Sequence, residues 1–185
     1  MKTVLIWLVS VVLGALIGGV SALWMAGLLP GGPRLGGTVE IEGWVSDWSI
    51  GSEAANPYVR ARIARHGLLA LRKEEAVYFT RAHDDDGERL REGCDYQVSG
   101  GNFPAEWWSI TLYDDESRLP LNNDNALSFD RSKAVALFAK PLTGWIISVS
   151  EAPPRSDRPE GWISNNGAGY FTLTIRLYRP EPGLL

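Results

Sequence analysis

Two stretches in the second half of the chain alternate apolar with polar residues, which is the period of a β-strand with one buried face. They cover residues 107–113 and 173–178 and are rich in aromatic and β-branched residues, which favour strands. The apolar faces hold Trp108, Ile110, Leu112, Leu173, Ile175 and Leu177. We predict that these six side chains are buried between two sheets, because a strand with this alternation has one face toward the core.

The first thirty residues follow a different pattern, because residues 4–29 carry no charge. As a helix this run would reach roughly 39 Å, which exceeds the roughly 30 Å hydrocarbon core of a bilayer. A cleaved signal peptide usually has an apolar run of only about 7–15 residues. The length therefore favours a retained transmembrane anchor over residues 1–30. Val20, Ser21 and Ala22 would suit a signal peptidase and leave cleavage as the alternative.

Charges around this run predict its orientation. Lys2 and the amino terminus precede it, and Arg34 follows it, which by the positive-inside rule favours an inside N-terminus. We therefore expect a single-pass protein of the inner (cytoplasmic) membrane whose C-terminal domain is periplasmic or extracellular. Gly14 and Gly18 have the spacing that lets two membrane helices approach closely, which makes a homodimer one expectation.

The remaining pattern predicts a tether with a first strand over residues 31–55, followed by one domain over residues 56–185. Asn56 and Pro57 begin a helix well, and Gly67 is expected to interrupt it. Strands are predicted near residues 38–44, 76–80, 96–98, 107–113 and 170–178, with a hairpin formed by 134–139 and 145–150. The predicted fold class is mainly β: an antiparallel sandwich with one early helix after the membrane helix.

The net charge and the cysteine content limit which classes of partner and which covalent cross-links the domain can have. Outside the anchor the chain has 17 basic and 22 acidic residues, since Lys2 is the one base removed with the anchor. This acidity argues against nucleic acid or an anionic lipid surface as the partner. Cys94 is the sole cysteine, so no internal disulfide forms and the domain depends on its hydrophobic core.

Short motifs throughout the domain have an order and spacing that resemble a known family. They lie at residues 57–62, 67–71, 75–79, 86–87, 96, 107–113, 122 and 173–180. The chain resembles the domain of unknown function 1214 family. The resemblance implies a jelly-roll-type β-sandwich module without an established reaction. Such modules often follow a second domain of unknown function, numbered 1254. Here a membrane span stands in its place, so the implied partner is a separate companion-domain protein or a second copy.

Residues typical of catalysis or metal binding are few. The histidines are His66 and His83, and no Gly-x-Ser-x-Gly segment is present for a serine nucleophile. Two histidines and Cys94, far apart in sequence, make a poor zinc site. The acidic run at residues 84–88 lacks calcium-loop spacing and predicts a hairpin turn. We therefore assign no catalytic, metal or cofactor-binding residue.

The candidate binding residues are aromatic or polar positions in and beside the motif strands. They are Trp107, Tyr113, Asn122, Arg176 and Tyr178. Exposed aromatics stack on flat apolar ligands, and an arginine beside them supplies a polar anchor. The sequence thus favours a non-catalytic binding or assembly module. The alternative is a hydrolase or other enzyme acting on an envelope carbohydrate or lipid, which would require a cleft lined by titratable groups with perturbed pKa values.

Overall fold

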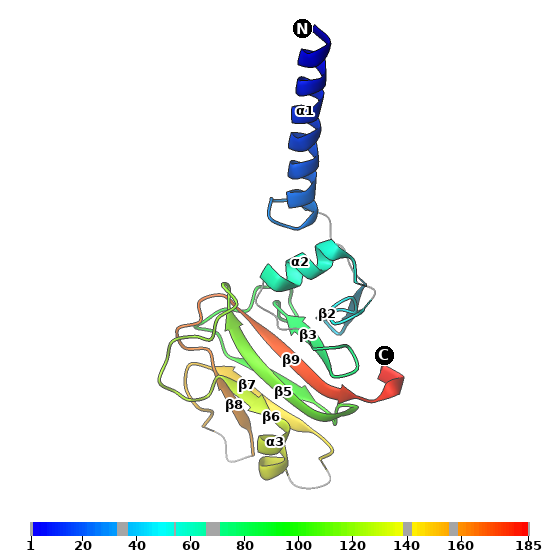
Figure 1. Cartoon of the computed structure of the whole chain (residues 1–185). Coiled ribbons are helices and arrows are strands. Elements are labelled where there is room, and N and C mark those ends of the chain that lie inside the picture. Colours follow the sequence, from blue (N-terminus) through cyan, green and yellow to red (C-terminus); the bar gives the residue numbers. More distant parts are fainter. Residues whose placement is uncertain are drawn as a thin grey trace.

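A computed structural model of the chain describes residues 2–32, 37–53, 55–65, 71–138, 142–155 and 159–184. The N-terminal helix α1 (Lys2–Met25) projects away from the rest of the molecule, and none of its residues is buried (Figure 1). Among the described residues it is the one helix that is long and apolar enough to cross a membrane. Such a helix fits either a signal anchor or a signal sequence.

The predicted strand at residues 38–44 is present over residues 38–41, after which the chain turns back and forms a hairpin. Strand β1 (Thr38–Ile41) pairs antiparallel with β2 (Trp44–Asp47) through a two-residue turn at Glu42 and Gly43. Both turn residues have positive φ angles, 50° and 77°. The turn and the second strand were not predicted, because this turn type is usually signalled by Asn-Gly or Asp-Gly, and glutamate gives no such signal.

The predicted early helix is confirmed as α2 (Pro57–Arg65), which lies between α1 and the sheets (Figure 1). The side-chain oxygen of Asn56 accepts a hydrogen bond from the backbone N–H of Tyr58, 2.9 Å away, as expected of an N-cap. The predicted interruption at Gly67 and the histidine at position 66 lie outside the described residues.

One sheet has six strands in the order β1-β2-β3-β9-β5-β6, and its pairs are all antiparallel. The two motif strands are neighbours inside this sheet, where Trp108 pairs with Leu177 and Ile110 with Ile175. The hairpin β1–β2 joins the same sheet. Its other strands are β3 (Ala76–Arg81), β5 (Ala105–Asp114), β6 (Ser128–Asp130) and β9 (Phe171–Pro180).

The second sheet has three strands in the order β4-β7-β8. They are β4 (Tyr96–Gly100), β7 (Trp145–Ser150) and β8 (Gly161–Ser164). Strand β4 runs antiparallel to β7, but β7 and β8 are parallel, so the expectation of an antiparallel arrangement fails at this pair. A short 3₁₀ helix at Pro182–Leu184 ends the described chain.

The predicted hairpin of residues 134–139 with 145–150 is wrong, because the first segment belongs to helix α3 (Arg131–Phe138). Residue 139 lies outside the described residues. A short apolar run does not distinguish a helix from a strand by its period alone. The decisive signal is Asp130, whose carboxylate accepts the backbone N–H groups of Ser132 and Lys133 at 2.8 and 3.1 Å and thereby caps the helix.

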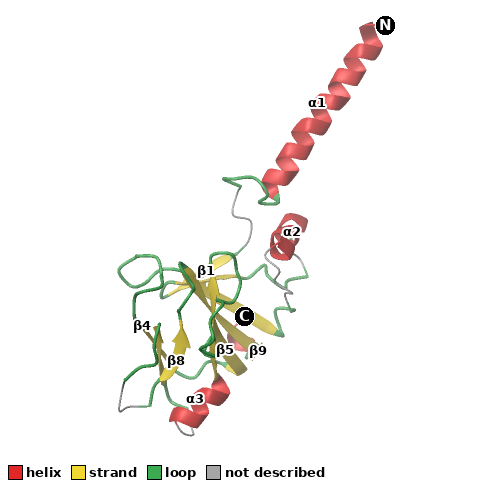
Figure 2. Ribbon diagram, turned by 90° about the vertical axis from the view of Figure 1, so that its left-hand side faces the viewer, coloured by secondary structure: helices red, strands yellow, loops and turns green. Residues whose placement is uncertain are grey.

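The two sheets share one hydrophobic core, with α3 at its lower end (Figure 2). All six alternating residues predicted to be buried are buried, and Trp108 is fully so. The ring of Trp108 in β5 lies 5.2 Å from the ring of Trp145 in β7, which joins one sheet to the other. Gly161 is required here, because a Cβ atom at this position would lie 2.4 Å from the Phe129 ring.

Candidate functional site

Four of the five predicted binding residues lie on one face of the six-stranded sheet, the face opposite the core. Trp107 and Tyr113 belong to β5, and Arg176 and Tyr178 belong to β9. They gather there because β5 and β9 are antiparallel neighbours in which Trp107 pairs with Tyr178 and residue 109 pairs with Arg176. We call this surface the outer β5–β9 face.

Arg176 is the polar centre of the outer β5–β9 face. Its Nη2 atom donates to the Tyr113 hydroxyl at 2.6 Å, and Nη1 donates to the Thr111 hydroxyl at 3.3 Å. Its guanidinium carbon lies 5.2 Å from the centre of the Tyr113 ring and 6.0 Å from that of Tyr78. Among the described residues no carboxylate forms an ion pair with Arg176. The positive charge of Arg176 is therefore held in a fixed position by uncharged hydroxyl groups and tyrosine rings.

An aromatic pair lies beside Arg176. The rings of Trp107 and Tyr178 are 5.3 Å apart and tilted by 57°. Trp107 is 38% exposed although it is a large aromatic residue in a central strand. Its indole N–H donates to the Ser132 hydroxyl at 3.4 Å, which fixes the ring against the start of α3. The face thus combines a partly exposed, oriented aromatic pair with a fixed cation.

Asn122 has a different role from the other four candidates. Its side-chain amide donates to the carbonyl of Asn166 at 2.7 Å, and its side-chain oxygen accepts the N–H of Asp124. The Asp124 carboxylate in turn accepts a 2.6 Å hydrogen bond from the buried hydroxyl of Ser164. These contacts connect the loop after β5 to the end of β8, so the role of Asn122 is structural.

A large groove that the sequence pattern does not predict is lined by residues of both sheets. Its volume is about 1270 Å³. Three segments wall it: the β1–β2 turn, residues 83–91 after β3, and residues 94–99, which include most of β4. Tyr170 and Leu173 complete the lining. We call it the β4 groove.

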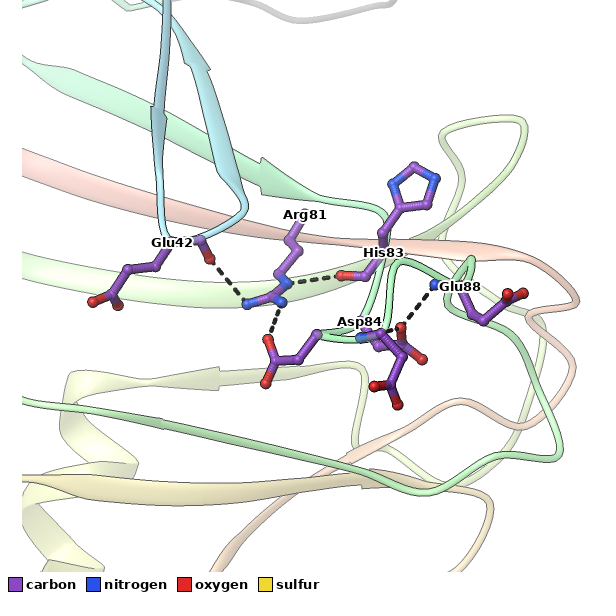
Figure 3. A network of polar contacts seen from close by, with 7 residues as sticks. Glu42, Arg81, His83, Asp84 and Glu88 are labelled. Carbon is purple, nitrogen blue, oxygen red and sulfur yellow. Dashed lines mark hydrogen bonds and ion pairs between the residues drawn. The ribbon is translucent and has the colours of Figure 1, made fainter.

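Arg81 lines the β4 groove and makes a network of polar contacts there (Figure 3). Its guanidinium donates to the carbonyl oxygen of His83 at 2.7 Å and to that of Glu42 at 3.1 Å, and it forms an ion pair with Asp85. Arg81 therefore ties the strained β1–β2 turn to the loop after β3. The side chain of His83 is exposed, and the residue contributes its backbone oxygen to this network.

The acidic run after β3 forms the hairpin turn that its Asp-Gly pair predicts. One carboxylate oxygen of Asp84 accepts the backbone N–H groups of Asp86 and Glu88 at 3.1 and 2.8 Å. Gly87 has a φ angle of 86°. Within the described residues no cluster of three or more His, Cys, Asp or Glu side chains has the arrangement of a metal site.

Two groups in the groove have shifted pKa values. Burial raises the pKa of Tyr96, whose hydroxyl oxygen also accepts the backbone N–H of Arg91 at 3.0 Å. Hydrogen bonding to Cys94 is the main cause that raises the pKa of Arg91. Both groups are protonated at neutral pH at their ordinary pKa values, and the upward shifts do not change this. Tyr96 and Arg91 can therefore donate hydrogen bonds to a ligand, and neither is prepared to act as a general base.

Comparison with known proteins places this architecture in a family. Residues 75–182, more than half of the chain, match the family described as "Protein of unknown function (DUF1214)". The chain belongs to the DUF1214 family. No curated protein matches it. The matched segment of this DUF1214 protein includes β3 to β9, and thus the whole outer β5–β9 face. The β1–β2 turn that walls the groove lies outside the match.

Two solved structures are similar to this DUF1214 chain. One is the VPA0106 protein from Vibrio parahaemolyticus, with 24% identity and a TM-score of 0.54 over 69% of this chain and 32% of that chain. The other is an uncharacterized protein from Burkholderia cenocepacia, with 14% identity and a TM-score of 0.40 over 58% and 27% of the two chains. This chain therefore spans about a third of the length of VPA0106, and the likeness to VPA0106 shows a shared fold.

Proposed function

We propose that this DUF1214 protein is a membrane-tethered binding or assembly module without catalytic activity. In this proposal α1 is retained as the anchor, and the domain faces the periplasm or the cell exterior. The jelly-roll-type sandwich implied by the family resemblance belongs to the same proposal. The observation that carries the function is the outer β5–β9 face, where Arg176 is held by Tyr113 beside the partly exposed pair of Trp107 and Tyr178.

This face has the properties of a protein-binding hot spot. Tryptophan, tyrosine and arginine contribute most of the binding energy at interfaces, particularly when their side chains are already held in one conformation. Here the guanidinium of Arg176 is fixed by two hydroxyl groups, and the Trp107 ring is fixed by Ser132. A partner that covered the face would bury the rings and place a carboxylate or carbonyl oxygen on Arg176.

The partner we propose is a separate companion-domain protein. VPA0106 contains this fold as about a third of its chain, so in that protein the fold is accompanied by further polypeptide. We propose that a separate protein covers the outer β5–β9 face of this module in a comparable way. A second copy of this protein is the other outcome that the test must distinguish.

The test is a pull-down of the full-length protein from solubilised membranes, with bound proteins identified by mass spectrometry. Changing Tyr113 and Tyr178 together to Ala should remove the companion-domain protein from the bound fraction. The matched control is Leu121→Ala, since Leu121 is 99% exposed and lies outside the face. Recovery of the same partner with the double variant would contradict the proposal. Recovery of tagged second copies alone would replace it with a homodimer.

An enzyme acting on an envelope carbohydrate or lipid is the second candidate function. The β4 groove favours it, because the groove is a cleft lined by two titratable groups with shifted pKa values. The direction of both shifts favours binding instead, since protonated Tyr96 and Arg91 cannot abstract a proton. Hydrolysis of an envelope glycan or lipid by the purified protein, abolished by Tyr96→Phe, would establish the enzyme.

The anchor has its own test. If α1 is retained, the protein fractionates with membranes and its intact mass includes residues 2–25. A mature chain that begins near Leu23 would show instead that the segment is a cleaved signal sequence.

A further inference from the structure

The β4 groove lies beside an open sheet edge. Strand β4 is the terminal strand of its sheet, and all five of its residues pair with β7 on one side. Four of them, residues 96–99, line the groove. In an antiparallel pair alternate N–H and C=O groups point away from the partner strand. The outer edge of β4 therefore presents unpaired backbone groups along the groove.

This edge lacks the features that usually prevent a strand from being added. Strand β4 has the sequence Tyr-Gln-Val-Ser-Gly, with no charged residue and no proline. At the opposite edge of the sheet β8 is partly covered, because the N–H of Ser164 donates to the carbonyl of Ala126 at 2.7 Å. In the other sheet β1 carries Glu40 and β6 has three residues. Of the described sheet edges, β4 is thus the one suited to pairing.

The groove has room for a segment of chain. Its volume of about 1270 Å³ exceeds the roughly 300–1000 Å³ typical of small-molecule sites. Five paired residues would extend roughly 17 Å along β4. Buried Leu90 and Leu173 supply an apolar floor, and Trp44 and Val98 at the walls are packed against the core. Every second side chain of an added strand would point toward this floor.

The charge of the groove indicates which side chains are favoured at the remaining positions of an added strand. Six carboxylates line it: Glu42, Asp84, Asp85, Asp86, Glu88 and Asp95. Three arginines also line it, but Arg81 is paired with Asp85 and Arg89 with Asp115. The lining is therefore acidic, and it favours lysine and arginine on a ligand.

We propose that the β4 groove binds an extended basic peptide segment of a partner, which adds to β4 as a further strand. Backbone hydrogen bonds to β4 would hold the segment, alternate apolar side chains would occupy the floor, and intervening lysines or arginines would meet the acidic rim. This recognition mode is β-strand addition. The groove is separate from the outer β5–β9 face, so this site does not depend on the proposed function.

Peptide binding to the full-length protein in detergent micelles tests the proposal. The probe is a fluorescent nine-residue peptide in which valine alternates with lysine, and the control peptide carries glutamate in place of lysine. The lysine peptide should bind at least about tenfold more tightly, because it complements the acidic rim. Absence of binding by the lysine peptide would overturn the proposal.

A pair of protein variants separates the groove from overall charge. Asp86→Lys with Glu88→Lys changes two rim carboxylates but keeps the Asp84 turn and the Arg81 network. It should weaken binding of the lysine peptide about tenfold. The control variant, Glu53→Lys with Glu181→Lys, changes the net charge equally at exposed positions outside the groove lining. Equal weakening by both variants would overturn the proposal.

Two N-methylated versions of the lysine peptide test the backbone contacts. One carries methyl groups on the amides of its odd residues and the other on those of its even residues. A strand presents alternate amides to one neighbour, so one version should lose binding and the other should keep it. Equal binding by the two versions would show that no strand is added to β4.

Discussion

The guanidinium of Arg62 in α2 donates two hydrogen bonds to the carbonyl oxygen of Met25, the last residue of α1. The distances are 3.0 Å from Nε and 2.8 Å from Nη2. The last carbonyl groups of a helix lack partners within the helix, and a positive charge near them is favourable. Arg62 therefore caps the apolar helix and connects it to the folded domain, over a separation of 37 residues.

We predict that Arg62→Ala loosens the end of α1. Loss of a charge-assisted hydrogen bond typically costs about 1.5–3 kcal/mol, so amide hydrogen exchange at residues 26–28 should accelerate at least about tenfold. The measurement is hydrogen exchange of the full-length protein in micelles. Arg60→Ala is the control, because Arg60 donates to the carbonyl of Glu53 and not to α1. Equal acceleration in both variants would contradict the capping role.

Glu42 is strained, and its replacement should stabilise the protein. Its φ angle of 50° lies in the left-handed region, which asparagine adopts more readily than glutamate. The Arg81 bond reaches its backbone oxygen and does not require its side chain. Glu42→Asn should therefore raise the free energy of unfolding by about 0.5–1 kcal/mol. Chemical denaturation measures this, with Glu40→Asn in the adjacent strand as a control that should give no gain.

Alternation along the sequence was sufficient to predict the central strands and four members of the outer β5–β9 face. It assigns Trp107 and Trp108 to opposite faces, and that assignment does not depend on which strands are neighbours. The strand prediction for the α3 segment was wrong because a short apolar run fits either a helix or a strand. The turn at Glu42 was not predicted, because glutamate seldom adopts a positive φ angle. Tertiary contacts, including the hydrogen bond from Arg81 to its carbonyl oxygen, stabilise it in this conformation.

The β4 groove could not be predicted for a different reason. Its walls come from segments near residues 42, 85, 96 and 170, which local periodicity does not relate to one another. The parallel pairing of β7 with β8 is also a long-range property. A pattern of alternation shows which face of a strand is buried, but it does not show which strand remains at an edge.

Trp108 should be among the most costly core positions to truncate. Its side chain is fully buried and contacts the rings of Phe103, Phe129 and Trp145. Trp108→Ala should lower the free energy of unfolding by about 3–5 kcal/mol. Trp108→Phe should cost less than half as much, because it keeps most of the volume and removes an indole N–H that has no hydrogen-bond partner among the described residues. An unchanged denaturation midpoint for Trp108→Ala would contradict this placement.

Asp114 at the end of β5 should make stability depend on pH. One of its carboxylate oxygens accepts the backbone N–H groups of Arg118 and Glu116 at 2.8 and 2.9 Å, and the other accepts the Arg118 side chain at 3.3 Å. The backbone N–H of Arg118 is the main cause that lowers the pKa of Asp114. The unfolded chain then binds the proton more readily than the folded protein. The stabilisation is therefore present above the unfolded pKa and is lost as the pH falls through the lowered folded pKa.

The expected result is that wild type is more stable than Asp114→Asn near neutral pH, and that this difference shrinks below about pH 4. Denaturation of both proteins across pH 2–7 (approximate limits) measures the difference. Arg118→Gln separates the causes, because it removes the side-chain contact but keeps both backbone N–H donors. Most of the pH dependence should survive in that variant. Its complete loss would show that the arginine charge, and not the backbone of the turn, sets the pKa of Asp114.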